Sequence, residues 1–140
     1  MSQELAGALA AEEAAIYAYG LIGVHLSEDE QDRARATEQA HRVRRDDLVG
    51  RLDELKASTA PAPAGYQLPF EVTDRESALK LAIHVEDGVA QAWRVVLPVT
   101  EGTERVDALS ALTDSAVRAT RWRRIAGVEP LTLAFPGRAG

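Results

Sequence analysis

The chain has 140 residues, a formal net charge of −6 and no cysteine. This length suits one domain, residues 1–140, that buries about two thirds of its unfolded surface around a single core. Without cysteine, disulfides, thiolate catalysis and iron–sulfur ligation are excluded, and the acidic balance argues against a nucleic-acid partner. The N-terminus lacks the basic region of a signal peptide, and no uninterrupted apolar run approaches about 18 residues. We therefore expect a cytoplasmic protein with no membrane span.

Four long helices are predicted, near residues 3–25, 28–57, 74–97 and 103–126. The first is rich in Ala, Glu and Leu, with apolar residues at steps of three and four. The segment Ser27–Glu30 is a capping box that opens the second helix after a very short turn, and Thr73–Glu76 is a capping box before the third. Gly127 and Pro130 end the fourth helix. Its predicted inward stripe comprises Leu109, Leu112, Ala116, Ala119 and Arg123.

The lengths of the links between helices predict how the helices are connected. Short links after the first and third helices make two antiparallel hairpins. Residues 58–73 form a much longer link, which contains the apolar stretch Tyr66–Phe70. About 15 extended residues reach about 50 Å, whereas a helix of about 30 residues is about 45 Å long. The link can therefore return along the bundle. We expect an all-α, ferritin-like four-helix bundle of two hairpins joined by one long crossover.

Residues 128–140 follow the last helix and are predicted to form an extended tail. Leu131, Leu133 and Phe135 alternate with smaller residues, so they share one face of an extended chain. Leaving three large apolar side chains together in water is unfavourable. We therefore expect Val128–Gly137 to lie over the bundle or against a second subunit, with a homodimer favoured.

A Glu-x-x-His pair, Glu38 and His41, is the strongest chemical signal in the chain. On a helix the two side chains project from one face, about 60° apart. Such a pair, with a lone carboxylate from a neighbouring helix, is half of the site that holds two iron or manganese ions in ferritin-like bundles. The lone carboxylates here are Glu12, or its neighbour Glu13, and Glu86. The sequence thus predicts that the candidate metal ligands meet at one depth of the interior: Glu12, Glu38, His41 and Glu86.

The second Glu-x-x-His pair of a dimetal site is missing. Asp114 is the only acid at the matching depth of the fourth helix, and Val117 stands where histidine is required. By helical angle Asp114 lies on the face of Arg118, so an i,i+4 ion pair is the better interpretation. Arg45 lies almost over Glu38, about two turns along. We therefore favour a buried Arg–Glu–His network, with Arg45 as counter-charge, over one bound metal ion, and one ion over two.

The segment Leu9–Gly20, with its Glu12-Glu13 and Tyr17-Ala-Tyr19, resembles the opening of an uncharacterised, alanine-rich, ferritin-like family found largely in actinobacteria. The resemblance extends to Tyr66–Phe70, Leu112–Trp122 and Ala134–Gly137. It implies a self-associating bundle and no assigned activity. The wider superfamily includes ferroxidases, peroxidases and hydroxylases. From it four positions carry over: Glu12, Glu38, His41 and Glu86. Where the family often has Glu-His, this chain has Glu12-Glu13, which removes one potential ligand.

Three functions are compatible with these residues. The favoured one is a non-catalytic, ferritin-like module with a degenerate dimetal site, which acts through self-association or a partner and carries no cofactor. The second is an iron- or manganese-dependent oxidoreductase or metal-binding protein. The third is a bundle that binds a small molecule in a pocket near Glu38 and His41. Metal analysis of protein purified without chelators separates the first two.

Overall fold

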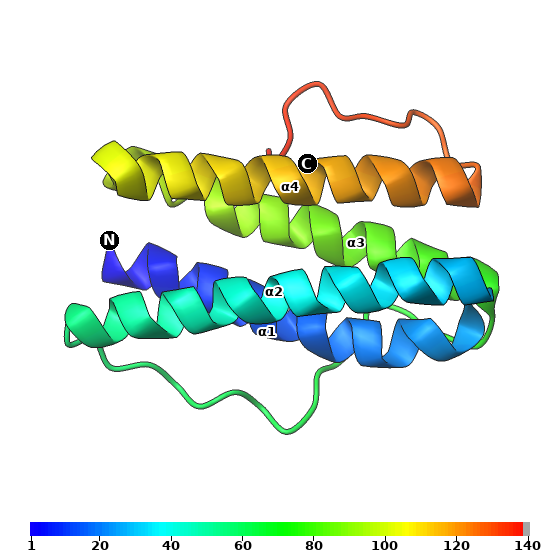
Figure 1. Ribbon diagram of the computed structural model, residues 1–140, viewed down its shortest axis with the longest axis horizontal. Coiled ribbons are helices and arrows are strands. Elements are labelled where there is room, and N and C mark those ends of the chain that lie inside the picture. The colour runs from blue at the N-terminus through cyan, green and yellow to red at the C-terminus, as the bar shows by residue number, and fades with distance from the viewer. Residues whose placement is uncertain (139–140) are drawn as a thin grey trace.

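The structure is a computed structural model that describes residues 1–138. Its four long helices are α1 (Ser2–Ile22), α2 (Glu28–Glu54), α3 (Arg75–Arg94) and α4 (Gly102–Ala126), and the described residues contain no strand (Figure 1). The predicted all-α fold of four helices is therefore confirmed. The first three helices each end about three residues earlier than expected. The 3-10 helix η1 (Gly23–His25) forms the last turn predicted for the first helix, and α3 is followed by a turn and the 3-10 helix η2 (Leu97–Val99). The tighter 3-10 turn is common at the end of a helix.

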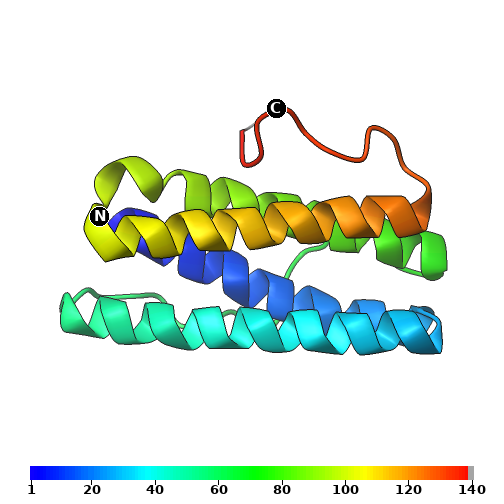
Figure 2. The same cartoon turned by 45° about the horizontal axis from the view of Figure 1, so that its top comes forward.

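Two pairs of consecutive helices pack side by side, α1 with α2 and α3 with α4, and α1 also packs on α3. Contacts between α2 and α4 are sparse, and Figure 2 shows these two helices on either side of α1. The fold is compatible with a four-helix bundle in which a groove separates α2 from α4. This asymmetry leaves α2 with a narrow buried stripe: Ala34, Thr37, His41, Leu48 and Leu52.

The link between α2 and α3 runs back along the molecule over residues 55–74 (Figure 1). Its apolar residues Leu68, Phe70 and Val72 pack against the core, and the Tyr66 ring lies 5.1 Å from that of Tyr17. These contacts explain why the link is apolar although it has no regular secondary structure. It returns the chain to the end of the molecule at which α2 began.

The N-terminal caps of α2 and α3 differ in one respect from the prediction. The Ser27–Glu30 capping box is present, and the Ser27 amide donates to Glu30 Oε1 at 3.1 Å. The second box uses Asp74 and Ser77, with Asp74 Oδ1 accepting from the Ser77 amide at 2.8 Å. The predicted Thr73–Glu76 box was therefore wrong by one residue. An aspartate carboxylate caps a helix as well as a threonine hydroxyl does, so the sequence pattern allows a box that begins at Thr73 or at Asp74.

The buried apolar residues form two clusters, one around Leu5, Leu52 and Trp93 and the other around Ile22, Leu81 and Trp122. The predicted inward stripe of α4 was partly wrong, because Leu109 is 51% exposed. Instead α4 buries mainly small residues: Ala108, Ala111, Leu112, Ser115, Ala119, Trp122 and Arg123. Small side chains let α4 approach α3 closely, which turns Leu109 outward.

The tail turns back over α3 and α4 after Gly127 (Figures 1 and 2). Arg94 donates to the carbonyl of Pro136 at 3.1 Å. Gly137 has φ +79°, and a Cβ there would lie 2.6 Å from the Ala90 carbonyl oxygen, so only glycine fits. The predicted apolar face of the tail is not uniformly buried, because Leu133 is 41% exposed and Phe135 is 58% exposed. Residues 139–140 of the predicted tail lie outside the described residues.

The segment Ser2–His25 is long and apolar enough to cross a membrane by length and composition. In this fold it supplies core residues such as Leu5, Leu9 and Ile22. A buried core helix has the same composition, and the segment carries the fully buried Glu12 at its centre.

Candidate functional site

A polar layer lies in the interior of the protein. Glu12 of α1, His41 of α2 and Glu86 of α3 are each 0% exposed. The sequence predicted that these three residues meet at one depth of the interior, and the structure brings them together. Glu12 rather than Glu13 faces inward, since Glu13 is only half-buried.

His41 bridges the two carboxylates with its two ring nitrogens. Nδ1 lies 2.5 Å from Glu12 Oε2, and Nε2 lies 2.8 Å from Glu86 Oε2. Both nitrogens can donate only when the ring is a protonated imidazolium. Burial lowers the pKa of His41, but the hydrogen bonds and charges of Glu12 and Glu86 outweigh burial and raise it to about 9. A positive imidazolium therefore stands between two carboxylates at neutral pH.

Three aromatic donors complete the network. Trp93 Nε1 donates to Glu12 Oε1 at 2.8 Å, and Tyr19 OH donates to Glu86 Oε2 at 2.5 Å. Trp122 Nε1 donates in turn to Tyr19 OH at 2.9 Å. Burial and then the Glu86 carboxylate raise the pKa of Tyr19 well above its usual value, so its hydroxyl keeps the proton that it donates. The network thus draws on all four helices.

The sequence contains a signal for two of these aromatic residues. Tyr19 follows Glu12 by seven residues, and Trp93 follows Glu86 by seven. Seven residues are nearly two turns, so each aromatic shares its glutamate's face of the helix. Because α1 and α3 run in opposite directions (Figure 1), the aromatic of each helix reaches the glutamate of the other. A repeated Glu-x6-aromatic spacing on two packed helices predicts this crossed pairing.

Two predicted members of the interior network lie outside it. Glu38 pairs with Arg42 Nη2 at 3.0 Å, and its side chain is 26% exposed. Arg45 pairs with Asp46 at 3.0 Å and does not reach the buried acids. The predicted role of Arg45 as counter-charge is therefore corrected, since His41 supplies that charge. Both residues sit at the edge of the narrow stripe that α2 buries, because α2 packs mainly on α1.

Helix α4 contributes no acid to the layer. Asp114 pairs with Arg44 of α2 at 2.5 Å, not with Arg118 as expected from the i,i+4 spacing. The neighbouring residue Ser115 is the one that α4 buries at this depth. The prediction that Asp114 points away from the interior holds, but its partner comes from another helix.

The donor atoms in this arrangement do not fit a metal ion. Both His41 nitrogens and both Glu12 oxygens are already hydrogen-bonded, and Glu86 Oε2 accepts twice. Among the side-chain atoms of this layer, Glu86 Oε1 alone is buried without a partner in the described residues. Within residues 1–138 no group of three or more His, Asp or Glu side chains has the geometry to hold a metal. A metal would have to displace the His41 proton, since a histidine ligand must be neutral.

The α2–α4 groove contains two hollows and two ion pairs that join the helices. Arg44 pairs with Asp114, and Arg51 donates to Glu104 at 2.6 Å. The hollow beside Arg51, of about 350 Å³, has Trp93 in its wall. The hollow at the other end, of about 270 Å³, has Trp122 in its wall. Each end of the buried network thus lies behind one hollow of the groove.

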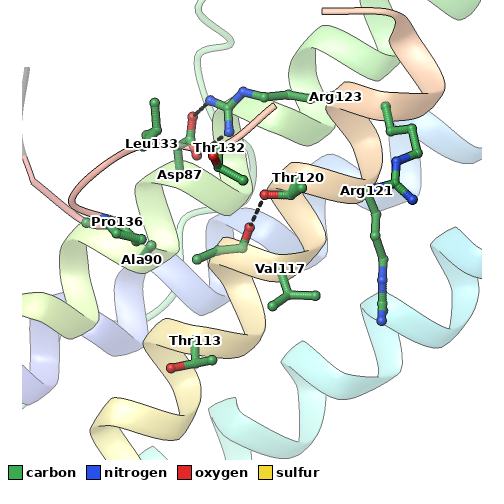
Figure 3. A pocket seen from close by; sticks show the side chains of 13 residues that line it. Asp87, Ala90, Thr113, Val117, Thr120, Arg121, Arg123, Thr132, Leu133 and Pro136 are labelled. Atoms are coloured by element: carbon green, nitrogen blue, oxygen red, sulfur yellow. Dashed lines mark hydrogen bonds and ion pairs between the residues drawn. The ribbon is translucent and has the colours of Figure 1, made fainter. Parts of the chain in front are cut away.

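Three further hollows lie elsewhere on the surface, and one of them, of about 730 Å³, lies between the end of α1 and the long link. Another, of about 230 Å³, lies beside Glu38 and Tyr19, at the place expected for a small-molecule pocket, although His41 itself is sealed behind it. The third, of about 510 Å³, lies between α3, α4 and the tail (Figure 3). Arg123 and Asp87 pair at its edge at 2.5 Å, and Thr113, Val117 and Leu133 form part of its wall.

The comparisons with known proteins identify a family. The family described as a domain of unknown function, DUF4439, matches residues 4–140. The chain belongs to the DUF4439 family. A crystal structure of a conserved hypothetical protein from Mycobacterium tuberculosis is similar to this DUF4439 chain, with 41% identity and a TM-score of 0.85 over 96% of this chain and 95% of the other. No match was found among the curated proteins.

Proposed function

We propose that this DUF4439 domain is a ferritin-like bundle of two hairpins and a crossover, whose dimetal-carboxylate site has become a metal-free polar network. In this proposal the domain is non-catalytic and cytoplasmic, and it acts through self-association. The observation that carries the proposal is the bridge from both nitrogens of His41 to Glu12 and Glu86, at 2.5 and 2.8 Å.

The charge balance of the layer supports a structural role for these residues. Two buried carboxylates without a cation would be strongly unfavourable. In dimetal proteins of the bundle type the metal ions supply the positive charge. Here the His41 imidazolium supplies it, and Trp93 and Tyr19 satisfy most of the remaining acceptor atoms. Closed networks of this kind hold helices in one register.

An exposed apolar surface supports self-association. Val106, Leu109 and Val117 of α4 are 65%, 51% and 41% exposed, and with Thr113 they fall within an arc of about 80° on the helix. Leu133 of the tail, 41% exposed, shares the wall of the large hollow with Thr113 and Val117. We call these five residues the α4–tail surface. Contiguous exposed apolar patches mark interaction sites.

The oligomeric state in solution tests the self-association. We expect a dimer by light scattering after gel filtration, and Leu109→Asp with Val117→Asp should convert it to a monomer without loss of helicity. Val43→Asp is the matched control, because Val43 is equally exposed, at 51%, but lies on α2. A wild-type protein that is monomeric at high concentration, or a dimer unaffected by the α4 changes, contradicts this part of the proposal.

Metal analysis of protein purified without chelators tests the chemical part. We expect no stoichiometric iron or manganese. About two metal ions per chain, with an oxidation activity that His41→Ala abolishes, would overturn the metal-free network in favour of a metal-dependent oxidoreductase.

A further inference from the structure

Three arginines from two helices line the smaller hollow of the α2–α4 groove. Arg33 comes from α2, and Arg118 and Arg121 come from α4, while Thr37 and Trp122 complete the wall. Figure 3 shows the Arg121 side chain extending from α4 towards α2. The groove thus brings together charges that are about 85 residues apart in the chain.

These arginines have no acidic partners, unlike their neighbours in the same groove. None of the three forms an ion pair within residues 1–138, although Arg44 and Arg51 pair with Asp114 and Glu104. Converging like charges repel one another, so an anion between them would be attracted.

Arg118 also carries a donor atom that lacks an acceptor. Its Nη1 is buried and has no hydrogen-bond partner in the described part of the chain. A buried guanidinium donor without an acceptor destabilises the folded state. The wall of the hollow therefore carries positive charge and hydrogen-bond donors, and at least one of these donors lacks an acceptor.

The chemistry of the three side chains selects the class of anion. A guanidinium presents paired N–H donors that match two oxygens of a phosphate, and several arginines can share its oxygens. A phosphate dianion would offset two of the three charges, whereas a carboxylate would offset one. The volume of about 270 Å³ accommodates a small ligand only.

We propose that Arg33, Arg118 and Arg121 form a binding site for a phosphate dianion, either inorganic phosphate or the phosphoryl group of a small monoester. Arg118, whose Nη1 atom is buried, forms the base of the site, and the exposed Arg33 and Arg121 contact the ligand from α2 and α4. The site shares no residue with the α4–tail surface, although Arg121 also lines the larger hollow beside that surface.

Calorimetric titration of the full chain with inorganic phosphate tests the site. The titration is done at about pH 7.5, where phosphate is mostly a dianion, and at a constant ionic strength of about 0.15 M. We expect saturable binding of one phosphate per chain. Arg118→Gln and Arg33→Gln should each weaken binding by about tenfold or more, because each removes a charge-assisted hydrogen bond.

Arg124→Gln is the matched control. Arg124 is an exposed arginine of α4 that is one turn from Arg121 but does not line the hollow. It should change the affinity by less than about twofold, because its charge is screened. Arg33 is exposed, so Arg33→Gln keeps the test valid if Arg118→Gln does not fold. Equal weakening by Arg33→Gln and Arg124→Gln, or no saturable binding to wild type, overturns the proposal.

Titration with phenyl phosphate under the same conditions separates the two sources of the phosphoryl group. Tighter binding of the monoester that is lost in Arg33→Gln indicates a phosphorylated small molecule. Equal or tighter binding of inorganic phosphate indicates the free ion. Monoester binding that Arg33→Gln leaves unchanged places the ligand elsewhere and contradicts the site.

Discussion

His41 is the residue on which the interior depends, because one imidazolium serves two buried carboxylates. Its two hydrogen bonds and those of Trp93 and Tyr19 leave Glu86 Oε1 as the one carboxylate oxygen of the layer without a partner among the described residues. Removal of one partner from such a network exposes the full desolvation cost of the other. The layer therefore stabilises the fold only while His41 is charged.

The first prediction concerns the dependence of stability on pH. The pKa of His41 is about 9 in the folded protein, whereas the ordinary pKa of a histidine is 6.5. Because the pKa of His41 is higher in the folded protein, protonation of His41 stabilises the fold. This stabilisation is fully present below pH 6.5 and is lost as the pH rises through 9. We expect the free energy of unfolding by urea to fall by about 3 kcal/mol between about pH 6 and pH 9.5.

Two variants show whether His41 causes this fall. His41→Gln should remove the dependence in this pH range and lower the stability at about pH 6 by about 3–5 kcal/mol, since it leaves buried acids uncompensated. His84→Gln changes an exposed histidine of α3 and should preserve the wild-type profile. A wild-type stability that is flat from neutral pH upward would contradict a charged His41.

Among the helices, the N-terminus of α2 carries a second electrostatic element. Glu30 accepts from the Ser27 amide and from Arg75 of α3, at 3.1 and 2.6 Å. The hydrogen bonds from Arg75 chiefly lower the pKa of Glu30 to about 2, despite its partial burial. One side chain thus caps α2 and ties it to the first residue of α3, at the end of the molecule to which the long link returns.

The second prediction is that Glu30→Gln lowers the free energy of unfolding by about 1 kcal/mol at neutral pH, because the cap weakens and the ion pair is lost. Because the pKa of Glu30 is lowered in the folded protein, its contribution to stability is present above the ordinary pKa of 4.5 and is lost as the pH falls through about 2. The variant should therefore lose less stability than wild type on acidification. Glu28→Gln, an exposed residue of the same first turn, is the control. Equal acid sensitivity of both variants and wild type would refute the role of Glu30.

Over the whole molecule, the tail and the groove make the two faces of the fold unequal. The tail covers α3 and α4 through the Arg94–Pro136 hydrogen bond and the close approach of Gly137 to Ala90. The α2–α4 groove on another side is held by ion pairs with little direct packing. The tail therefore packs on the α3–α4 hairpin, the same hairpin that contributes α4 to the α4–tail surface.

The third prediction is that deletion of residues 128–140 lowers the melting temperature or dissociates the oligomer. The deletion exposes the part of α3 around Ala90 and removes Leu133 from the α4–tail surface. Thermal unfolding by circular dichroism and light scattering measure the two effects separately. A truncated chain that keeps both the melting temperature and the mass of wild type would show that the tail has no role in either.

The features that depend on local periodicity could be predicted from the sequence. The four helices follow from apolar spacing, capping boxes and glycine or proline stops, and the depth of Glu12, His41 and Glu86 follows from a constant rise per residue. Their meeting in the interior could therefore be predicted by counting from the turns. The Glu-x6-aromatic spacing was also present in the sequence, but its meaning required the knowledge that α1 packs antiparallel on α3.

Which residues at the margin of each helix's apolar face are buried could be learned only from the packing of the helices. Because α2 packs on α1 and is separated from α4 by a groove, its buried stripe is too narrow to include Glu38 and Arg45. Because α4 packs on α3 through small residues, Leu109 turns outward and Arg118 and Arg121 face the groove opposite Arg33. Helical periodicity fixes the angles between residues on one helix, whereas the rotation of that helix depends on side chains of its neighbours that are distant in sequence.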